Sequence, residues 1–240
     1  MPKLFRSARR RGPPLPADAD AATRAIIERV GPFTMTSPER IMAVRDAVAH
    51  VCRHGIAGAI VECGVWRGGS MMAAALTLLE FGERRPLHLF DTFAGMPPPG
   101  TVDRDITGTA AARLLATEDR ATGSTWAYSP LDDVRENVLG TGYPPELVAF
   151  VPGRVEETIP AHAPEQIAVL RLDTDWYEST RHELEHLYPR LTVGGLLIVD
   201  DYGHWEGARR AVDEYLAATG AKLFLARIDY TGRLAVKLTA

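Results

Sequence analysis

Short apolar runs alternate with amphipathic stretches along most of the chain. The runs lie at 59–63, 87–91, 148–151, 167–172 and 195–199, and glycine or acidic residues follow most of them. Continuous apolar runs of this kind are typical of parallel strands that are buried on both faces. The segments between them have the apolar spacing of helices, at 71–81, 131–139, 178–191 and 206–219. This alternation predicts an α/β fold with a central sheet between two helical layers.

The two ends of the chain complete the predicted domain. A helix at 37–54 precedes the first strand, with Ser37 as its N-cap and Gly55 as its stop. Near the C-terminus, 222–227 and 233–237 flank a turn and predict an antiparallel hairpin. We therefore expect a seven-stranded, mostly parallel sheet in a single domain over 21–240, with N-terminal helices at 21–55. Residues 1–20 are basic and proline-rich, which predicts a disordered tail.

One long stretch interrupts the alternation. Residues 94–130 contain Pro97-Pro98-Pro99-Gly100, many small polar residues and a short helical pattern near 109–115. Irregular stretches of this length inside a compact domain are usually functional. The sequence therefore predicts a lid insertion at about 94–130.

The composition is that of an ordinary globular protein. Hydrophobic residues make up 46% of the chain and charged residues 24%, and the formal net charge of −4 argues against a general nucleic-acid-binding surface. Cys52 and Cys63 stand in apolar surroundings without metal-ligand spacing, which predicts reduced thiols in a cytoplasmic protein. No run approaches the roughly 20 apolar residues of a membrane span, and no signal-peptide core follows the basic N-terminus.

The loop after the first predicted strand indicates the kind of cofactor. The strand ends in Glu62-Cys63-Gly64 and the next helix starts at Gly68-Gly69-Ser70, so a ligand can approach the backbone closely. The pattern is not the dinucleotide fingerprint G-x-G-x-x-G, and an acid at the strand end repels a pyrophosphate. It suits a cationic ligand such as S-adenosylmethionine, whose ribose Asp91 is placed to bind. Another nucleotide-binding loop is the alternative at this point.

Acidic residues follow two further strands. Asp173 and Asp175 come after the run at 167–172, and Asp200 and Asp201 come after the run at 195–199. Neighbouring strands lie about 4.8 Å apart, so these carboxylates converge and repel one another unless a cation neutralises them. An all-oxygen set favours a hard divalent ion such as Mg²⁺. The alternative is that the acids cap the helices that follow. His204 stands at the mouth of this predicted site and is a candidate contact for the acceptor.

Several segments together resemble the macrocin-type O-methyltransferase family. The segments are Thr34 to Arg40, Val61 to Ser70, Asp91 to Pro97, Leu172 to Thr180 and Gly194 to Gly203, and the resemblance covers about residues 30–240. The family consists of Mg²⁺-requiring enzymes that use S-adenosylmethionine to methylate hydroxyls of sugars and related groups on natural products. They are usually dimers or larger, with a mobile lid. The resemblance implies a class I methyltransferase fold, a Rossmann-like three-layer sandwich.

The resemblance also implies roles for individual residues. It makes Asp173, Asp200 and Asp201 the metal ligands. It makes Glu62, Gly64, Ser70, Asp91 and Phe93 cofactor contacts, with Thr34 and Met35 closing over the methionine end. The more distantly similar catechol-type enzymes have asparagine where Asp201 stands. Residues 99–128 match nothing in the family, so the acceptor is not identified.

The expected reaction is transfer of a methyl group to a metal-bound hydroxyl. Asp175 is the first candidate for the base, because it lies beside the cluster without being needed as a ligand. In the alternative, Asp175 binds the cofactor's ammonium group and Asp173 takes the proton.

We expect a cytoplasmic O-methyltransferase, a homodimer or higher homo-oligomer, acting on a small-molecule hydroxyl, most simply a deoxysugar of a secondary metabolite. A catechol-like or other small diol is the alternative acceptor. A silent cofactor-binding scaffold is the non-enzyme alternative, which the retained acidic cluster argues against. A nicotinamide-dependent dehydrogenase is disfavoured by the missing fingerprint.

Overall fold

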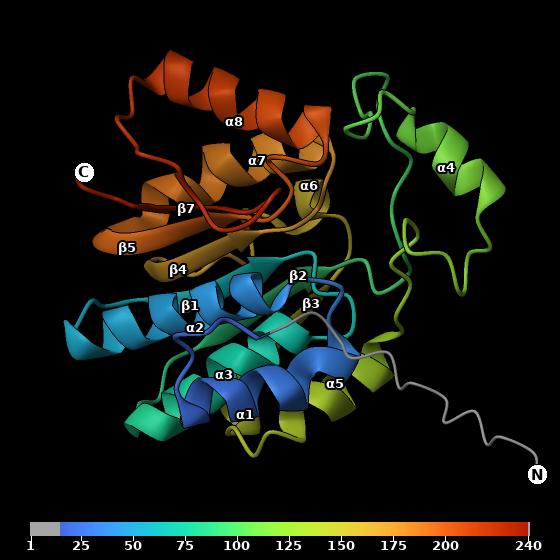
Figure 1. Cartoon of the computed structure of the whole chain (residues 1–240). Coiled ribbons are helices and arrows are strands. Elements are labelled where there is room, and N and C mark those ends of the chain that lie inside the picture. The colour runs from blue at the N-terminus through green and yellow to red at the C-terminus, as the bar shows by residue number, and fades with distance from the viewer. Residues whose placement is uncertain (1–14, 240) are drawn as a thin grey trace, which may run out of the picture.

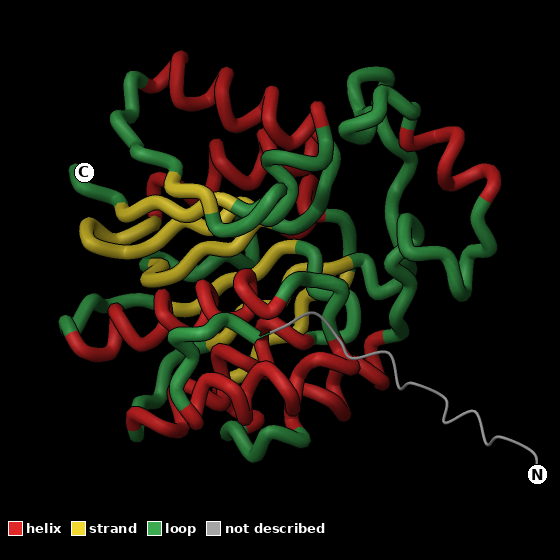
Figure 2. Tube along the Cα trace, viewed as in Figure 1, coloured by secondary structure: helices red, strands yellow, loops and turns green. Residues whose placement is uncertain are grey.

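The structure, a computed structural model, describes residues 15–239 and has a seven-stranded sheet at its centre (Figures 1 and 2). The strands are β1 (Ala59–Cys63), β2 (Leu87–Asp91), β3 (Val148–Pro152), β4 (Ile167–Leu172), β5 (Leu191–Val199), β6 (Ala226–Arg227) and β7 (Arg233–Val236). Their order is β3-β2-β1-β4-β5-β7-β6, with β1 to β5 parallel and β7 antiparallel to both β5 and β6. The predicted α/β sheet with its antiparallel C-terminal pair is confirmed.

Helices cover both faces of the sheet (Figure 1). They are α1 (Ala21–Val30), α2 (Pro38–Arg53), α3 (Gly69–Phe81), α4 (Ala111–Thr117), α5 (Leu131–Leu139), α6 (Val155–Thr158), α7 (Tyr177–Leu187) and α8 (Glu206–Thr219), with 3₁₀ turns at Gly31–Phe33, Pro145–Leu147 and Tyr188–Arg190. One apolar core joins α1, α2, α3 and α5 to one face, and a second joins α6, α7 and α8 to the other. The parallel strands β1 to β5 contribute side chains to both cores, as strands buried on both faces must.

The sheet register aligns the carboxyl ends of four strands. Cys63 of β1 lies opposite Phe90 of β2 and Leu172 of β4, and Leu172 lies opposite Val199 of β5. The residues that follow these positions therefore form one row along the edge of the sheet, in the order Asp91, Gly64, Asp173, Asp200. The switch in strand order lies between β1 and β4, where open α/β sheets bind their ligands.

The structure corrects three predicted boundaries. The helix expected over 178–191 ends at Leu187, because Pro189 cannot continue it, and β5 begins at Leu191 rather than at residue 195. The strand expected over 222–227 is reduced to Ala226–Arg227, and Phe224 just before it is 85% exposed. The predicted tail over 1–20 lies mostly outside the described residues.

The inserted segment 94–130 carries α4 away from the body of the domain (Figure 1). Its base is fixed by Asp103, which is 1% exposed and accepts a hydrogen bond from the backbone of Tyr177 at 2.9 Å. A small apolar cluster joins it to the starts of α7 and α8, where Trp176 and Trp205 pack edge to face at 4.9 Å. Movement of this segment as a lid stays a prediction. No helix within residues 15–239 is long and apolar enough to cross a membrane.

Candidate active site

A cavity of about 310 Å³ opens along the row of strand ends. It is bounded by the loops after β1, β2, β4 and β5, by the segment before α2 and by parts of the inserted segment. Its size is in the range of small-molecule binding sites. Its lining residues include the predicted Thr34, Met35, Gly64, Ser70, Asp91, Asp173, Asp175, Asp200 and Asp201.

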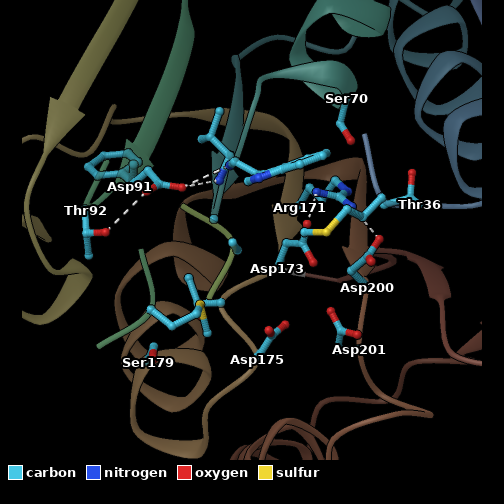
Figure 3. Close-up of a pocket in the computed structure, with 18 of the residues that line it drawn as sticks. Thr36, Ser70, Asp91, Thr92, Arg171, Asp173, Asp175, Ser179, Asp200 and Asp201 are labelled. Atoms are coloured by element: carbon cyan, nitrogen blue, oxygen red, sulfur yellow. Dashed lines mark hydrogen bonds and ion pairs between the residues drawn. The ribbon is translucent and has the colours of Figure 1, made fainter. Parts of the chain in front are cut away.

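At one end of the cavity the backbone itself forms the surface. Gly64 has a φ of +82°, and a side chain there would strike the carbonyl of Asp173. Both oxygens of Asp91 accept backbone hydrogen bonds, from Val65 at 2.6 Å, Trp66 at 3.1 Å and Phe93 at 2.7 Å (Figure 3). Burial raises the pKa of Asp91, while these donors lower it. Asp91 thus holds the turn after β1 in shape as well as facing the cavity.

The segment before α2 lies directly on the start of α3. A side chain at Gly69 would come within 2.6 Å of the Phe33 carbonyl oxygen and 2.7 Å of Thr34. Thr34 and Thr36 share a hydroxyl hydrogen bond at 2.9 Å, and the Met35 side chain is 47% exposed. Because residue 69 is glycine, the segment before α2 can pack against the start of α3 and cover the cavity.

Two predicted cofactor residues lie behind the cavity wall. Glu62 is 1% exposed and pairs with Arg171, and neither Glu62 nor Phe93 is among the described residues that line the cavity. Burial raises the pKa of Glu62 to about 7, and Arg171 opposes that rise. Direct contact of Glu62 and Phe93 with a cofactor stays a prediction.

The other end of the cavity is acidic. Asp173, Asp175 and Asp201 each place a carboxylate oxygen within 4.8 Å of the others (Figure 3). Burial raises the pKa of Asp173 and Asp201 well above the usual range, and their acidic neighbours raise it further. Burial and then the charge of Asp173 raise the pKa of Asp175 to about 8. None of these side chains caps α7 or α8, whose N-cap residues are Trp176 and Trp205, so the helix-cap alternative fails.

This acidic cluster fits a hard divalent cation. Three half-buried carboxylates at such separations repel one another, and a bound cation would remove both the repulsion and the tendency to take up protons. The donors are all oxygen, the set that Mg²⁺ prefers. The residues present therefore suit the metal that the family resemblance implies.

Asp200 lies differently from its two predicted partners. One of its carboxylate oxygens accepts from Arg171 at 2.5 Å, and the other pairs with Arg40 of α2. Arg171 also donates to Asp173 at 2.7 Å and pairs with Glu62, so it links the carboxyl ends of β1, β4 and β5. Asp200 thus faces two guanidinium groups, while Asp175 completes the close cluster.

The sequence analysis missed these two arginines. Arg171 left a signal, because it is the one charged residue in the apolar run 167–172 and a buried charge requires partners. Arg40 gave no such signal, because its position in α2 resembles an ordinary helix surface until the packing of α2 on the sheet is known. Tyr230, which lines the cavity from the β6–β7 turn, was also missed, and its hydroxyl lies 3.4 Å from Nδ1 of the predicted His204.

Comparison with known proteins identifies the family of this chain. The family model for macrocin O-methyltransferases (TylF) matches residues 17–236. This chain belongs to that family. Among curated relatives, it is 36% identical over 204 residues to the 8-demethyl-8-(2,3-dimethoxy-α-L-rhamnosyl)-tetracenomycin-C 4′-O-methyltransferase of Streptomyces olivaceus, with 83% of this chain and 73% of the relative covered. It is 34% identical over 200 residues to the mycinamicin III 3″-O-methyltransferase of Micromonospora griseorubida, with coverage of 83% and 76%.

A solved structure agrees with the family assignment. The O-methyltransferase NovP superposes with a TM-score of 0.75 at 34% identity, covering 86% of this chain and 83% of NovP. The class I methyltransferase fold expected from the resemblance is confirmed, and the macrocin-family protein described here is an S-adenosylmethionine-dependent O-methyltransferase.

Proposed function

We propose that this enzyme methylates a hydroxyl of a sugar carried by a natural product, with Mg²⁺ as its metal. The observation that carries the proposal is the pairing of a backbone-lined cofactor end with a cluster of three carboxylates in one cavity. The relatives support the acceptor class, because their names describe methylation of a rhamnosylated tetracenomycin and of a mycinamicin.

The cofactor would occupy the end of the cavity between β1 and β2. Asp91 is placed to accept from the ribose hydroxyls with the lone pairs that its backbone donors leave free. Gly64 lets the methionine part pass close to the backbone, and Thr34 and Met35 cover it from above. Ser70, at the start of α3, lines the same end.

The metal would be held at the acidic end by Asp173 and Asp201, which both the family resemblance and the geometry place in the cluster. Asp200 is the third ligand by resemblance and lies against Arg40 and Arg171 in the structure. When bound, Mg²⁺ lowers the pKa of an acceptor hydroxyl and fixes its oxygen. Burial raises the pKa of Asp173, and Arg171 opposes that rise and orients the carboxylate, since its guanidinium donates to it at 2.7 Å.

Asp175 would take the proton from the acceptor hydroxyl. Its carboxylate lies within 4.8 Å of the Asp173 and Asp201 oxygens, so an acceptor hydroxyl held there is within its reach. Trp205 lines the same cavity and packs edge to face against Trp176 at 4.9 Å, which gives this wall an apolar surface.

The acceptor would enter beside His204 and Tyr230. Tyr230 is 59% exposed although it lines the cavity, so its ring is available for stacking against a sugar. Asp229 fixes the turn that carries it, accepting from Gly232 at 2.7 Å and pairing with Arg40 at 3.0 Å. This turn forms the wall that faces the acidic cluster.

The test is product formation with the acceptors of the named relatives. The protein is incubated with S-adenosylmethionine, Mg²⁺ and each of three probes, a rhamnosylated tetracenomycin, mycinamicin III or a catechol. Mass spectrometry then detects methylated product. Methylation of a glycosylated probe and not of the catechol supports the proposal. Methylation of the catechol alone would show that the acceptor is a small diol and not a sugar. Product formed equally well after removal of divalent metal would contradict the proposed dependence on Mg²⁺.

Two further predictions follow from the sequence. The resemblance predicts a homodimeric or larger assembly, and the two isolated cysteines predict a cytoplasmic location. Light scattering on the purified protein tests the first. Fractionation of the producing cells tests the second.

A further inference from the structure

Glu183 of α7 is a fully buried acid with an incomplete set of partners. Its side chain is 0% exposed, and Oε1 accepts a hydrogen bond from the Thr174 hydroxyl at 2.9 Å. Within residues 15–239, Oε2 has no nitrogen or oxygen partner, and the Cys63 thiol, a weak donor, also lies against this carboxyl. Burying such a group is unfavourable, and an apolar residue at this position on the inner face of α7 would pack without that cost. Its presence therefore calls for an explanation other than stability.

The partner of Glu183 belongs to an unusual turn of the active site. Asp175 has a φ of +68°, and the Trp176 N–H donates to the Thr174 carbonyl at 2.7 Å. A hydrogen bond between residues i and i+2 around a positive φ is the pattern of the classic γ-turn, which is rare and strained. For a non-glycine residue, such a conformation persists only where the surroundings fix it.

The backbone on both sides of this turn is fixed by other contacts. Before it, the Asp173 N–H donates to the Cys63 carbonyl at 2.8 Å. After it, the Trp176 indole donates to the Pro97 carbonyl at 3.0 Å, and the Tyr177 N–H donates to Asp103 at 2.9 Å. Inside the turn, the described side-chain hydrogen bond of Thr174 is the one to Glu183. Glu183 therefore holds Thr174, the first residue of the turn, which the flanking contacts leave free.

We propose that Glu183 is a positioning residue that acts through the Thr174 hydroxyl to hold the turn in which Asp175 faces the acidic cluster. This inference rests on the proposed function in one respect, the role of Asp175 as the base. The Glu183 carboxyl is fully buried behind the turn and is not among the described residues that line the cavity. Burial raises its pKa well above the usual range, so it works as a neutral hydrogen-bonding group.

Four variants separate positioning from packing. Glu183→Leu removes the acceptor, Glu183→Gln keeps it, and Thr174→Val removes the hydroxyl at nearly constant shape. Glu185→Gln is the matched control, because Glu185 lies on the same helix and pairs with Arg181 on the surface at 2.8 Å. Each protein is assayed for kcat and for both KM values with the methylated probe, for S-adenosylhomocysteine affinity by calorimetry, and for Tm.

We expect kcat to fall about 10²-fold in Glu183→Leu and Thr174→Val, because displacing a catalytic group by about 1 Å has an effect of this size. Glu183→Gln and the control should keep the kcat of the parent. S-adenosylhomocysteine affinity should not change, and the Tm of Glu183→Leu should stay level or rise, because a buried unpaired oxygen is lost. Loss of kcat only in variants whose Tm falls with it would overturn the proposal, since that is the result of a structural role.

A second measurement needs no acceptor. Hydrogen–deuterium exchange follows the peptide that contains the Trp176 amide, which is protected by the γ-turn hydrogen bond. Thr174→Val and Glu183→Leu should speed its exchange, and Glu185→Gln should not. Unchanged protection in both would overturn the proposal. An Asp175→Asn variant with full kcat would instead overturn the assignment of Asp175 as the base. The exchange result would still decide whether Glu183 holds the turn.

Discussion

The two ends of the cavity use aspartate in opposite ways. Asp91 after β2 receives three backbone N–H groups, whereas Asp173 and Asp201 after β4 and β5 face each other and Asp175. Burial raises the pKa at both ends, but the donors around Asp91 lower it again, while the neighbours of Asp201 raise it further. At one end of the cavity, the carboxylate of Asp91 therefore already has its hydrogen-bond donors. At the other end, the clustered carboxylates lack the positive charge that would balance their repulsion. The first end suits a cofactor, and the second suits a cation.

Asp201→Ala tests the acidic end with the largest expected effect, because asparagine would keep an oxygen that can bind a metal. Loss of a metal ligand should remove several kcal/mol of transition-state stabilisation, so kcat should fall about 10³-fold. S-adenosylhomocysteine affinity, measured by calorimetry, should not change, because the cofactor end does not use this carboxylate. Asp132→Ala, at a position whose side chain is 93% exposed, is the matched control. Equal loss of cofactor affinity would show that the two ends are not separate.

Asp175→Asn tests the base without removing a predicted ligand. The amide cannot accept the proton, so kcat should fall about 10²-fold or more. Mg²⁺ binding and the KM for S-adenosylmethionine should persist, which distinguishes this variant from Asp201→Ala. Steady-state kinetics with the methylated probe gives the answer. If Mg²⁺ binding disappears with kcat, Asp175 is a ligand and Asp173 becomes the candidate base.

Asp91→Ala tests the cofactor end. It removes an acceptor shared by three backbone donors and a ribose contact, and hydrogen bonds to charged groups contribute about 1.5–3 kcal/mol. The KM for S-adenosylmethionine should rise about tenfold or more and Tm should fall, while the Mg²⁺ affinity stays. Calorimetry with each ligand and a melting curve measure all three. An unchanged KM would mean that Asp91 only shapes the loop.

Tyr230→Ala should have the smallest effect. Stacking of the exposed ring against a sugar contributes about 0.5–1.5 kcal/mol, so the acceptor KM should rise about three- to tenfold with little change in kcat. Tyr202→Phe is the control, because the Tyr202 hydroxyl bonds Asp213 outside the described cavity. An unchanged acceptor KM in Tyr230→Ala would place the acceptor elsewhere.

The strands and the acids at their ends could be predicted because both leave local patterns. Buried parallel strands are continuous apolar runs, and Asp91, Asp173 and Asp200 follow three of them directly. Which acids meet could not be predicted, because Asp200 is turned toward Arg40 by the packing of α2 on the sheet. The conformation of Asp175 depends on Glu183 and on Asp103, contacts that no local pattern contains. The extra strand residues at 191–194 were missed because Thr192 and Gly194 interrupt the apolar pattern before the run at 195–199.

Calorimetric titration of MgCl₂ into the protein saturated with S-adenosylhomocysteine tests the central claim most directly, with Asp201→Ala measured beside the parent. We predict a saturable Mg²⁺ heat in the parent, no such heat in the variant, and the same S-adenosylhomocysteine affinity in both. An equal Mg²⁺ heat in both proteins, or none in the parent, would contradict the assignment of the acidic end to a cation.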